Sequence, residues 1–170
     1  MIKAIMSRRD FQIFYLSYGN ICNPYYGEVV PVRAISISDV GSRGMMFTDT
    51  DLVEVLSLFF DDEEDGPTAM TKEDSQRIAE FLKDWDGEVV VHCGAGISRS
   101  AAVAAAICIG KGWDEKWIWN NGKFCPNRRC YRLTCEAFGF VINGSSFLEQ
   151  EESNFETNLA EWKKENDVED

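Results

Sequence analysis

The segment Val91-His92-Cys93-Gly94-Ala95-Gly96-Ile97-Ser98-Arg99-Ser100 separates a predicted strand from a predicted helix. The apolar run Glu88–His92 is typical of a strand in the middle of a parallel sheet. The run Ser100–Gly110 is rich in alanine and apolar nearly all round, which predicts a buried helix. A glycine-bearing loop that leads into a helix N-terminus points its backbone N–H groups at one spot. The segment therefore predicts an anion-binding loop.

Cys93 stands at the start of this loop and Arg99 at its end. The loop N–H groups and the helix dipole stabilise a cysteine thiolate at such a position. The planar guanidinium of Arg99 can donate two parallel hydrogen bonds to phosphate oxygens, which a lysine cannot do. Gly94 and Gly96 lack a Cβ, so the backbone can curve tightly and approach a ligand closely. The alternative is a buried strand-end cysteine followed by a surface arginine, and the combined pattern disfavours it.

Outside this segment, the pattern predicts strands that alternate with helices. The predicted strands are Ile2–Met6, Pro31–Ser38 and Leu52–Phe60. Two helices are predicted to begin after Ser7 and Thr71, each of which is followed three residues later by an aspartate, as in a capping box. Two more helices are predicted over Arg128–Val141 and Ser153–Glu165. The alternation predicts a single α/β domain with a central, mostly parallel sheet flanked by helices. We assign residues 1–150 to this domain and residues 151–170 to an acidic C-terminal helix or tail.

The chain of 170 residues carries 17 basic and 29 acidic side chains, a net charge of −12. This balance disfavours nucleic acid as a partner, because binding there depends on cations that neutralise backbone phosphates. The longest apolar run, Ala101–Ile109, is about half the length that a membrane-spanning helix needs. The N-terminal residues lack the apolar core of a signal peptide. We therefore expect a cytoplasmic protein that does not associate with membranes.

The chain has six cysteines and one histidine. Cys125, Cys130 and Cys135 are spaced by five and no CxxC pair occurs, which argues against a zinc site. Nothing in the sequence points to a secreted protein, so we expect most of these thiols to be small core residues rather than halves of disulfides. We predict neither a metal nor another cofactor.

His92–Ser100 matches the HCxxxxxRS signature of the protein tyrosine phosphatases, and its Ala-Gly-Ile-Ser interior resembles the dual-specificity branch. The resemblance implies hydrolysis of phosphotyrosine, and of phosphoserine or phosphothreonine as further substrates, on a phosphorylated protein or peptide. It implies Cys93 as the nucleophile, Ser100 as the group that eases thiolate departure, and His92 as an organiser of the loop. The phosphate-binding residues implied are Gly94, Ala95, Gly96, Ile97, Ser98 and Arg99. It also implies that Asn127, in a Pro-Asn pair before the last core helix, braces the phosphate loop.

A phosphate monoester releases an alkoxide or phenolate, so the reaction needs a proton donor. The acidic cluster Asp61-Asp62-Glu63-Glu64-Asp65 follows the predicted strand Leu52–Phe60 and offers several carboxyl groups. The resemblance implies Asp62 as the general acid, with Asp61 and Asp65 as alternatives. Such a cluster is more often a solvated loop.

Three other functions share parts of this pattern. A degenerate phosphatase could bind phosphoproteins without turnover, although loss of Cys93 or Arg99 would be the sign of that, and both are present. A phosphatase of a non-protein phosphate ester is a second alternative; the loop interior contains no lysine, which disfavours inositol phosphates. A sulfurtransferase or arsenate reductase would share the cysteine loop but would need neither Ser100 nor an upstream aspartate.

Overall fold

The computed structural model describes residues 1–18, 30–42 and 46–142. Within these ranges the elements are β1 (Ile2–Ser7), α1 (Arg8–Tyr18), β2 (Val32–Ser38), β3 (Val53–Phe59), α2 (Lys72–Leu82), β4 (Glu88–Cys93), α3 (Arg99–Lys111), α4 (Lys116–Trp119) and α5 (Arg128–Ala137). The predicted alternation of strands and helices is confirmed over these residues.

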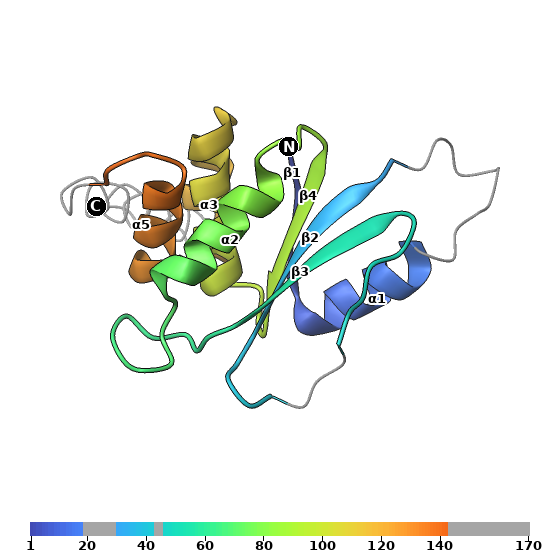
Figure 1. The fold of residues 1–170 in the computed structure, drawn as a ribbon, viewed down its shortest axis with the longest axis horizontal. Coiled ribbons are helices and arrows are strands. Elements are labelled where there is room, and N and C mark those ends of the chain that lie inside the picture. The colour runs from blue at the N-terminus through green and yellow to red at the C-terminus, as the bar shows by residue number, and fades with distance from the viewer. Residues whose placement is uncertain (19–29, 43–45, 143–170) are drawn as a thin grey trace, which may run out of the picture.

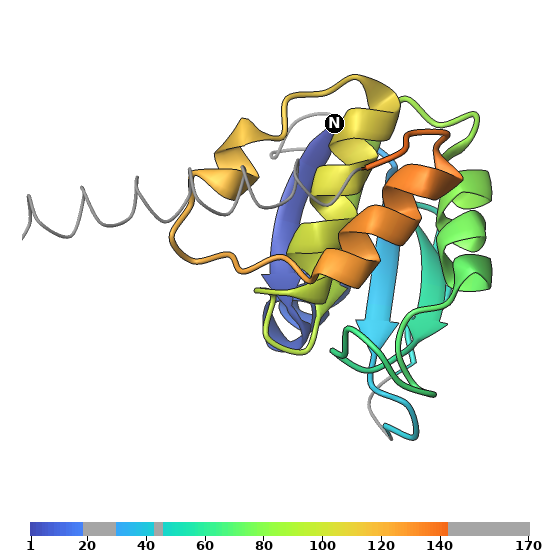
Figure 2. The ribbon, with the colours of Figure 1, turned by 90° about the vertical axis from the view of Figure 1, so that its left-hand side faces the viewer.

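The strands form one sheet in the order β1-β4-β2-β3, and every described pair is parallel. The strands therefore all run in the same direction, as the arrows of β1, β2 and β3 show in Figure 2, and their carboxyl ends meet at one edge of the sheet. Strand β4, which precedes the cysteine loop, lies between β1 and β2. This position in the middle of the sheet agrees with the apolar composition of Val89–Val91, which are all fully buried.

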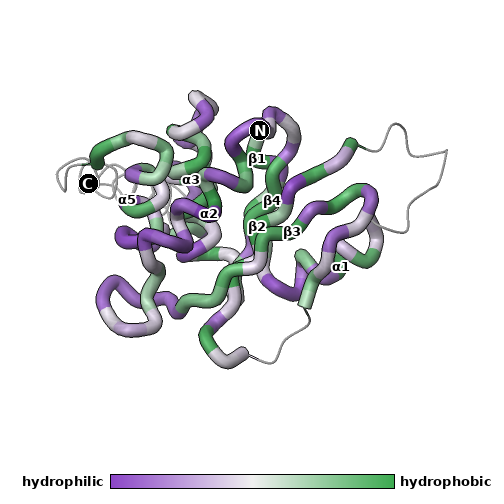
Figure 3. The backbone as a smooth tube through the Cα atoms, in the orientation of Figure 1, coloured by the Kyte–Doolittle hydropathy of each residue, from purple (hydrophilic) through white to green (hydrophobic). Residues whose placement is uncertain are grey.

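Helices cover both faces of the sheet. Helices α2, α3 and α5 lie on one face, and α1 lies on the other (Figures 1 and 2). Side chains of β2 alternate between the two sides: Ile35 and Ile37 belong to the core under α2, α3 and α5, whereas Val32 and Ala34 belong to the core under α1. The hydrophobic segments accordingly follow the strands through the middle of the molecule (Figure 3).

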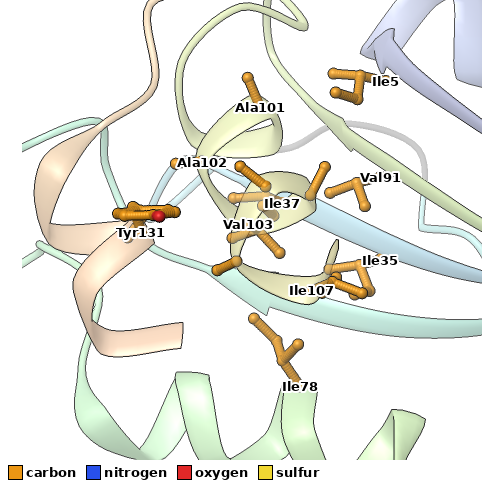
Figure 4. Close-up of a cluster of buried hydrophobic side chains, with 14 of the residues drawn as sticks. Ile5, Ile35, Ile37, Ile78, Val91, Ala101, Ala102, Val103, Ile107 and Tyr131 are labelled. Carbon is orange, nitrogen blue, oxygen red and sulfur yellow. The ribbon is translucent and has the colours of Figure 1, made fainter. Parts of the chain in front are cut away.

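Helix α3 is packed between the sheet and α5. Residues 101–106 are all fully buried, and five of the six are alanines, so the helix backbone can approach its neighbours closely. Ile107 of α3 lies near Ile35 and Ile78 in the same cluster (Figure 4). Burial of each such isoleucine side chain stabilises the fold by about 1.5–3 kcal/mol. The start of α3, which follows the cysteine loop, is buried as well: Ser100 and Ala101 are fully buried.

The C-terminal part differs from the sequence prediction. Helix α5 ends at Ala137 rather than at Val141, because Gly139 adopts a left-handed conformation (φ 87°) and its N–H bonds back to Glu136 O at 3.0 Å. The one-turn helix α4 was not predicted, since four residues are too few to show a periodic pattern. The predicted helix Ser153–Glu165 and the tail 151–170 lie outside the described residues. No helix in the described ranges is long and apolar enough to cross a membrane.

Candidate active site

Three loops meet at the carboxyl edge of the sheet. They are the cysteine loop after β4, the turn that begins at Asp39 after β2, and the segment 60–70 after β3, which we call the acid loop. Ligands of open parallel sheets bind at this edge. The topology therefore brings the signature and the acidic cluster to one place, although they are far apart in the sequence.

Cys93 is the last residue of β4 and only 2% exposed. Its Sγ accepts a hydrogen bond from the Gly96 backbone N–H at 3.3 Å and lies 3.2 Å from Oγ of Ser100. Ser100 is fully buried in the first turn of α3. A backbone N–H, a hydroxyl group and the N-terminus of α3 thus converge on the sulfur atom.

Gly96 packs closely against the backbone of Met6 and Ser7, in addition to donating its N–H to Cys93. Its φ is +75°, and a Cβ on it would lie 2.5 Å from both the Met6 carbonyl carbon and the Ser7 nitrogen. The Arg8 N–H also donates to Gly94 O at 3.1 Å. The cysteine loop thus rests on the backbone where β1 ends and α1 begins.

We expect Gly96→Ala to lower both thermal stability and activity, because the methyl group would displace the loop from Met6 and Ser7. A left-handed conformation alone costs about 1–2 kcal/mol in a residue with a Cβ. The matched control is Gly112→Ala, where φ is +68° and no atom lies within 4 Å of the added Cβ. Differential scanning fluorimetry and phosphatase assays would compare the two. An equal loss of Tm with unchanged activity in both variants would contradict this prediction.

The guanidinium of Arg99 is held on one side by protein acceptors. Its Nη1 donates to Phe60 O at 2.7 Å and lies 2.7 Å from Oδ1 of Asp39. Nη2 lies beside Gly94, 3.6 Å from the position of a Cβ there. The side chain is only 7% exposed, and its buried Nε has no hydrogen-bond partner among the described residues. Apart from Asp62 Oδ2, which lies 4.0 Å from Nε, the Nε–Nη2 edge is the one that can bind a bidentate anion.

His92 is fully buried on the α1 side of the sheet. Its ring stacks on Phe11 at 4.2 Å between centroids, and Phe47 meets it edge-on at 5.5 Å. Its Nδ1 lies 3.4 Å from Cys93 O, which can only accept, so this nitrogen carries the proton. Burial, with a smaller effect from Arg8, lowers the pKa of His92 to about 4. The ring is therefore neutral near pH 7 and positions the end of β4.

The neutral His92 should make stability depend on pH. Its folded pKa of about 4 lies below the ordinary 6.5, so between these values the unfolded chain binds a proton that the folded chain does not. Stability is then expected to fall as the pH drops from about 6.5 to 4, by at most about 3 kcal/mol from this residue. Urea unfolding across this range should show a steeper fall in the wild type than in His92→Asn. Equal slopes would count against it.

Asp62, in the acid loop, contacts the cysteine loop. Its Oδ1 accepts from Ser98 Oγ at 2.8 Å and from Asn127 Nδ2 at 3.1 Å, and its Oδ2 lies 4.0 Å from Arg99 Nε. The carboxylate remains 41% exposed, so a substrate can reach it. These contacts place it beside both the loop and the arginine.

The two alternative aspartates point elsewhere. Asp61 Oδ1 accepts from the Val40 N–H at 2.9 Å and so faces the turn after β2. Asp65 is 97% exposed and lies 3.6 Å from Arg129 Nη1. Of the three candidates for general acid, Asp62 is the one whose carboxylate contacts the cysteine loop.

Asn127 caps α5, as its Oδ1 accepts from the Cys130 N–H at 2.9 Å. Its Nδ2 contacts Asp62 rather than the cysteine loop. The sequence resemblance implied a brace of the phosphate loop; in the structure the amide braces the acid loop. The neighbouring Cys125 N–H makes the bond to the cysteine loop, at Ile97 O (3.1 Å).

Two carboxylates of this region make contacts that the sequence did not predict: Asp39, which the sequence analysis did not single out, and Glu64, which it named only as a member of the acidic cluster. Asp39 contacts Arg99, and Glu64 accepts from the backbone N–H groups of Arg128 and Arg129 at 2.8 and 2.9 Å, which ties the acid loop to the start of α5. The position of Asp39 directly after β2 was an available signal, because parallel strands end at a common edge. In the described residues, no group of three or more His, Cys, Asp or Glu could hold a metal ion.

No protein-family model and no curated protein matches this chain. A crystal structure of a human tyrosine phosphatase-like serine/threonine/tyrosine-interacting protein is similar, with 22% identity over 62% of this chain and 75% of that chain and a TM-score of 0.46. A crystal structure of PTPMT1 in complex with PI(5)P has 22% identity over 64% and 77%, with a TM-score of 0.40. Independently of both, the chain resembles the protein tyrosine phosphatase superfamily in its HCxxxxxRS signature, in the strand–loop–helix setting of that signature and in the parallel sheet around it.

Proposed function

We propose that this protein is a cysteine-dependent phosphatase of phosphotyrosine in proteins or peptides, with phosphoserine and phosphothreonine as further candidate substrates. The observation that carries the proposal is the environment of Cys93 Sγ. The sulfur accepts a hydrogen bond from the Gly96 N–H and lies 3.2 Å from Ser100 Oγ. Cys93 ends β4, and Arg99 Nη2 lies 3.6 Å from the position of a Cβ on the next residue, Gly94. A nucleophile, anion donors and a cation are thus assembled around one point.

In the first step, the Cys93 thiolate attacks phosphorus and the bond from phosphorus to the leaving oxygen breaks. The loop N–H groups and the Nε–Nη2 edge of Arg99 hold the equatorial oxygens as their charge develops. Asp62 in its carboxylic-acid form gives its proton to the leaving oxygen. The products are a neutral alcohol or phenol and a cysteinyl-phosphate.

In the second step, water attacks the phosphorus of the cysteinyl-phosphate. The Asp62 carboxylate takes the proton of the water, and the sulfur–phosphorus bond breaks to release inorganic phosphate. Cys93 departs as a thiolate, which Ser100 Oγ and the Gly96 N–H stabilise by hydrogen bonding. The loop and arginine supply the positive field that both steps need.

The contacts of Ser100 and Asp62 favour a phosphatase over a sulfurtransferase or an arsenate reductase. Those activities need an anion-binding cysteine but neither a hydroxyl at the sulfur nor an acid at the loop. Here Ser100 lies next to Cys93 Sγ, and Asp62 bonds to Ser98 within the loop.

The proposal is tested by steady-state hydrolysis of para-nitrophenyl phosphate by the full chain, reduced and in the presence of EDTA. We expect turnover that does not depend on a metal. When the reaction is stopped by rapid quenching, we also expect to detect protein that carries one phosphoryl group on Cys93. Phosphotyrosine and phosphoserine peptides of matched sequence would then define the substrate. A folded, reduced protein that binds phosphate without turnover would replace the proposal by that of a phosphoprotein-binding module.

A further inference from the structure

The exposed carboxylate of Asp39 contacts the most buried cation of the site. Its side chain is 61% exposed, yet its Oδ1 lies 2.7 Å from Arg99 Nη1, while the arginine side chain is 7% exposed. The mechanism above gives Asp39 no role. We propose that Asp39 is a positioning residue that fixes the orientation of the Arg99 guanidinium; this rests on the proposed function.

The geometry divides the guanidinium into two edges. Nη1 is shared by two acceptors, Asp39 Oδ1 and Phe60 O, both at 2.7 Å. Two acceptors on one nitrogen oppose rotation of the planar group, and an ionic bond of this kind is about twice as strong as a neutral one. The Nε–Nη2 edge, whose Nη2 lies beside Gly94, is then already oriented to bind the phosphate oxygens. Preorganised donors of this kind act in the transition state.

Asp39 is itself held in place. It opens a turn in which Ser42 N–H bonds to Asp39 O at 3.1 Å and Gly41 has a φ of 74°. The next N–H, that of Val40, donates to Asp61 Oδ1 at 2.9 Å. Asp61 therefore fixes the turn that carries Asp39, while the adjacent Asp62 faces the cysteine loop. The two neighbouring aspartates have separate tasks.

A positioning role differs from competition with substrate. A carboxylate that competed for the anion-binding edge would contact Nε or Nη2, and its removal would strengthen phosphate binding and raise activity. Asp39 instead contacts Nη1, whereas Nη2 is the nitrogen that lies beside Gly94. Its charge is largely exposed and therefore screened by solvent. Its removal should weaken transition-state binding and leave ground-state phosphate binding nearly unchanged.

The test uses Asp39→Ala, Asp39→Asn and the control Asp51→Ala, an exposed aspartate before β3 at the opposite edge of the sheet. With para-nitrophenyl phosphate, Asp39→Ala should lose about 10-fold in kcat with less than about 2-fold change in KM, as expected for an interaction used in the transition state. Asp39→Asn keeps an acceptor and should recover part of the loss. Thermal unfolding should be unchanged in all three variants.

A double-mutant cycle with Arg99→Lys isolates the effect, with calorimetric affinities for vanadate and inorganic phosphate as the readout, so that no turnover is needed. Asp39→Ala should weaken vanadate binding about 10-fold in the wild-type background and hardly at all in Arg99→Lys. Phosphate affinity should change little. Equal effects in both backgrounds, or a rise in kcat, would overturn the positioning role. An inactive wild type that still shows this coupling would reject the proposed function and retain the inference.

Discussion

Cys93→Ser is expected to abolish turnover of para-nitrophenyl phosphate, with a loss of at least about four orders of magnitude in kcat, because a neutral hydroxyl group, a weak nucleophile, replaces the thiolate. The hydroxyl is nearly isosteric, and Ser100 Oγ and the Gly96 N–H can still bond to it. The variant should therefore fold and bind phosphate like the wild type. Stopped assays for activity and calorimetry for phosphate would measure the two properties separately.

Cys125→Ser is the matched control for this prediction. Cys125 is exposed, and it contacts the cysteine loop through its backbone N–H, which the substitution retains. Its activity should stay within about twofold of the wild type. The thiols of Cys108 and Cys135 are not candidate nucleophiles, because burial raises the pKa of each to about 12 and keeps them protonated. Measurable turnover in Cys93→Ser would show that another residue attacks phosphorus.

Asp62→Asn should give the second large effect. The amide keeps an oxygen to accept from Ser98 and Asn127 but has no acidic proton to donate. With a phosphotyrosine peptide we expect kcat to fall by about 100-fold or more, within the range for loss of a general acid. The fall should be smaller with para-nitrophenyl phosphate, because para-nitrophenolate leaves readily without a proton.

The pH dependence separates an acid from a structural residue. If Asp62 is the proton donor, the alkaline limb of the kcat profile should disappear in Asp62→Asn. Asp61→Asn is the control: its oxygen can still accept from Val40, so we expect a loss of no more than about threefold and an unchanged profile. A larger loss in Asp61→Asn than in Asp62→Asn would reassign the acid.

The sequence predicted the parts of the fold that depend on local pattern. Four strands, the capped helix after Thr71 and the buried alanine-rich helix each carry a periodic or compositional signal, and all are present. The anion-binding loop was predictable because its glycines, Cys93 and Arg99 are contiguous in the chain. Helix α5 ended early because its stop signal is one left-handed glycine, Gly139, which is weak beside a continuing apolar pattern.

The contacts between loops were harder to predict. Nothing in the run Asp61-Asp62 shows which carboxylate faces the cysteine loop, since a strand end can rotate either side chain inward. The choice depends on Phe60 N–H, which bonds to Ser38 O at 3.0 Å and so continues the β3 pairing by one residue. The contact between Asp39 and Arg99 depends likewise on how far the carboxyl end of β2 extends relative to that of β4, which the sequence does not show.

The packing of Gly96 against Met6 and Ser7 has a consequence for the order of folding. Strand β1 lies at the edge of the sheet and pairs with β4 alone among the described strands. A chain that has folded from β2 onward already contains every residue of the proposed mechanism. Its cysteine loop, however, still lacks the packing contact with the backbone of Met6 and Ser7. During refolding, activity should then appear only when β1 docks onto β4, as the last cooperative event. Protection of the β1 amides from hydrogen exchange should therefore rise at the same rate as activity.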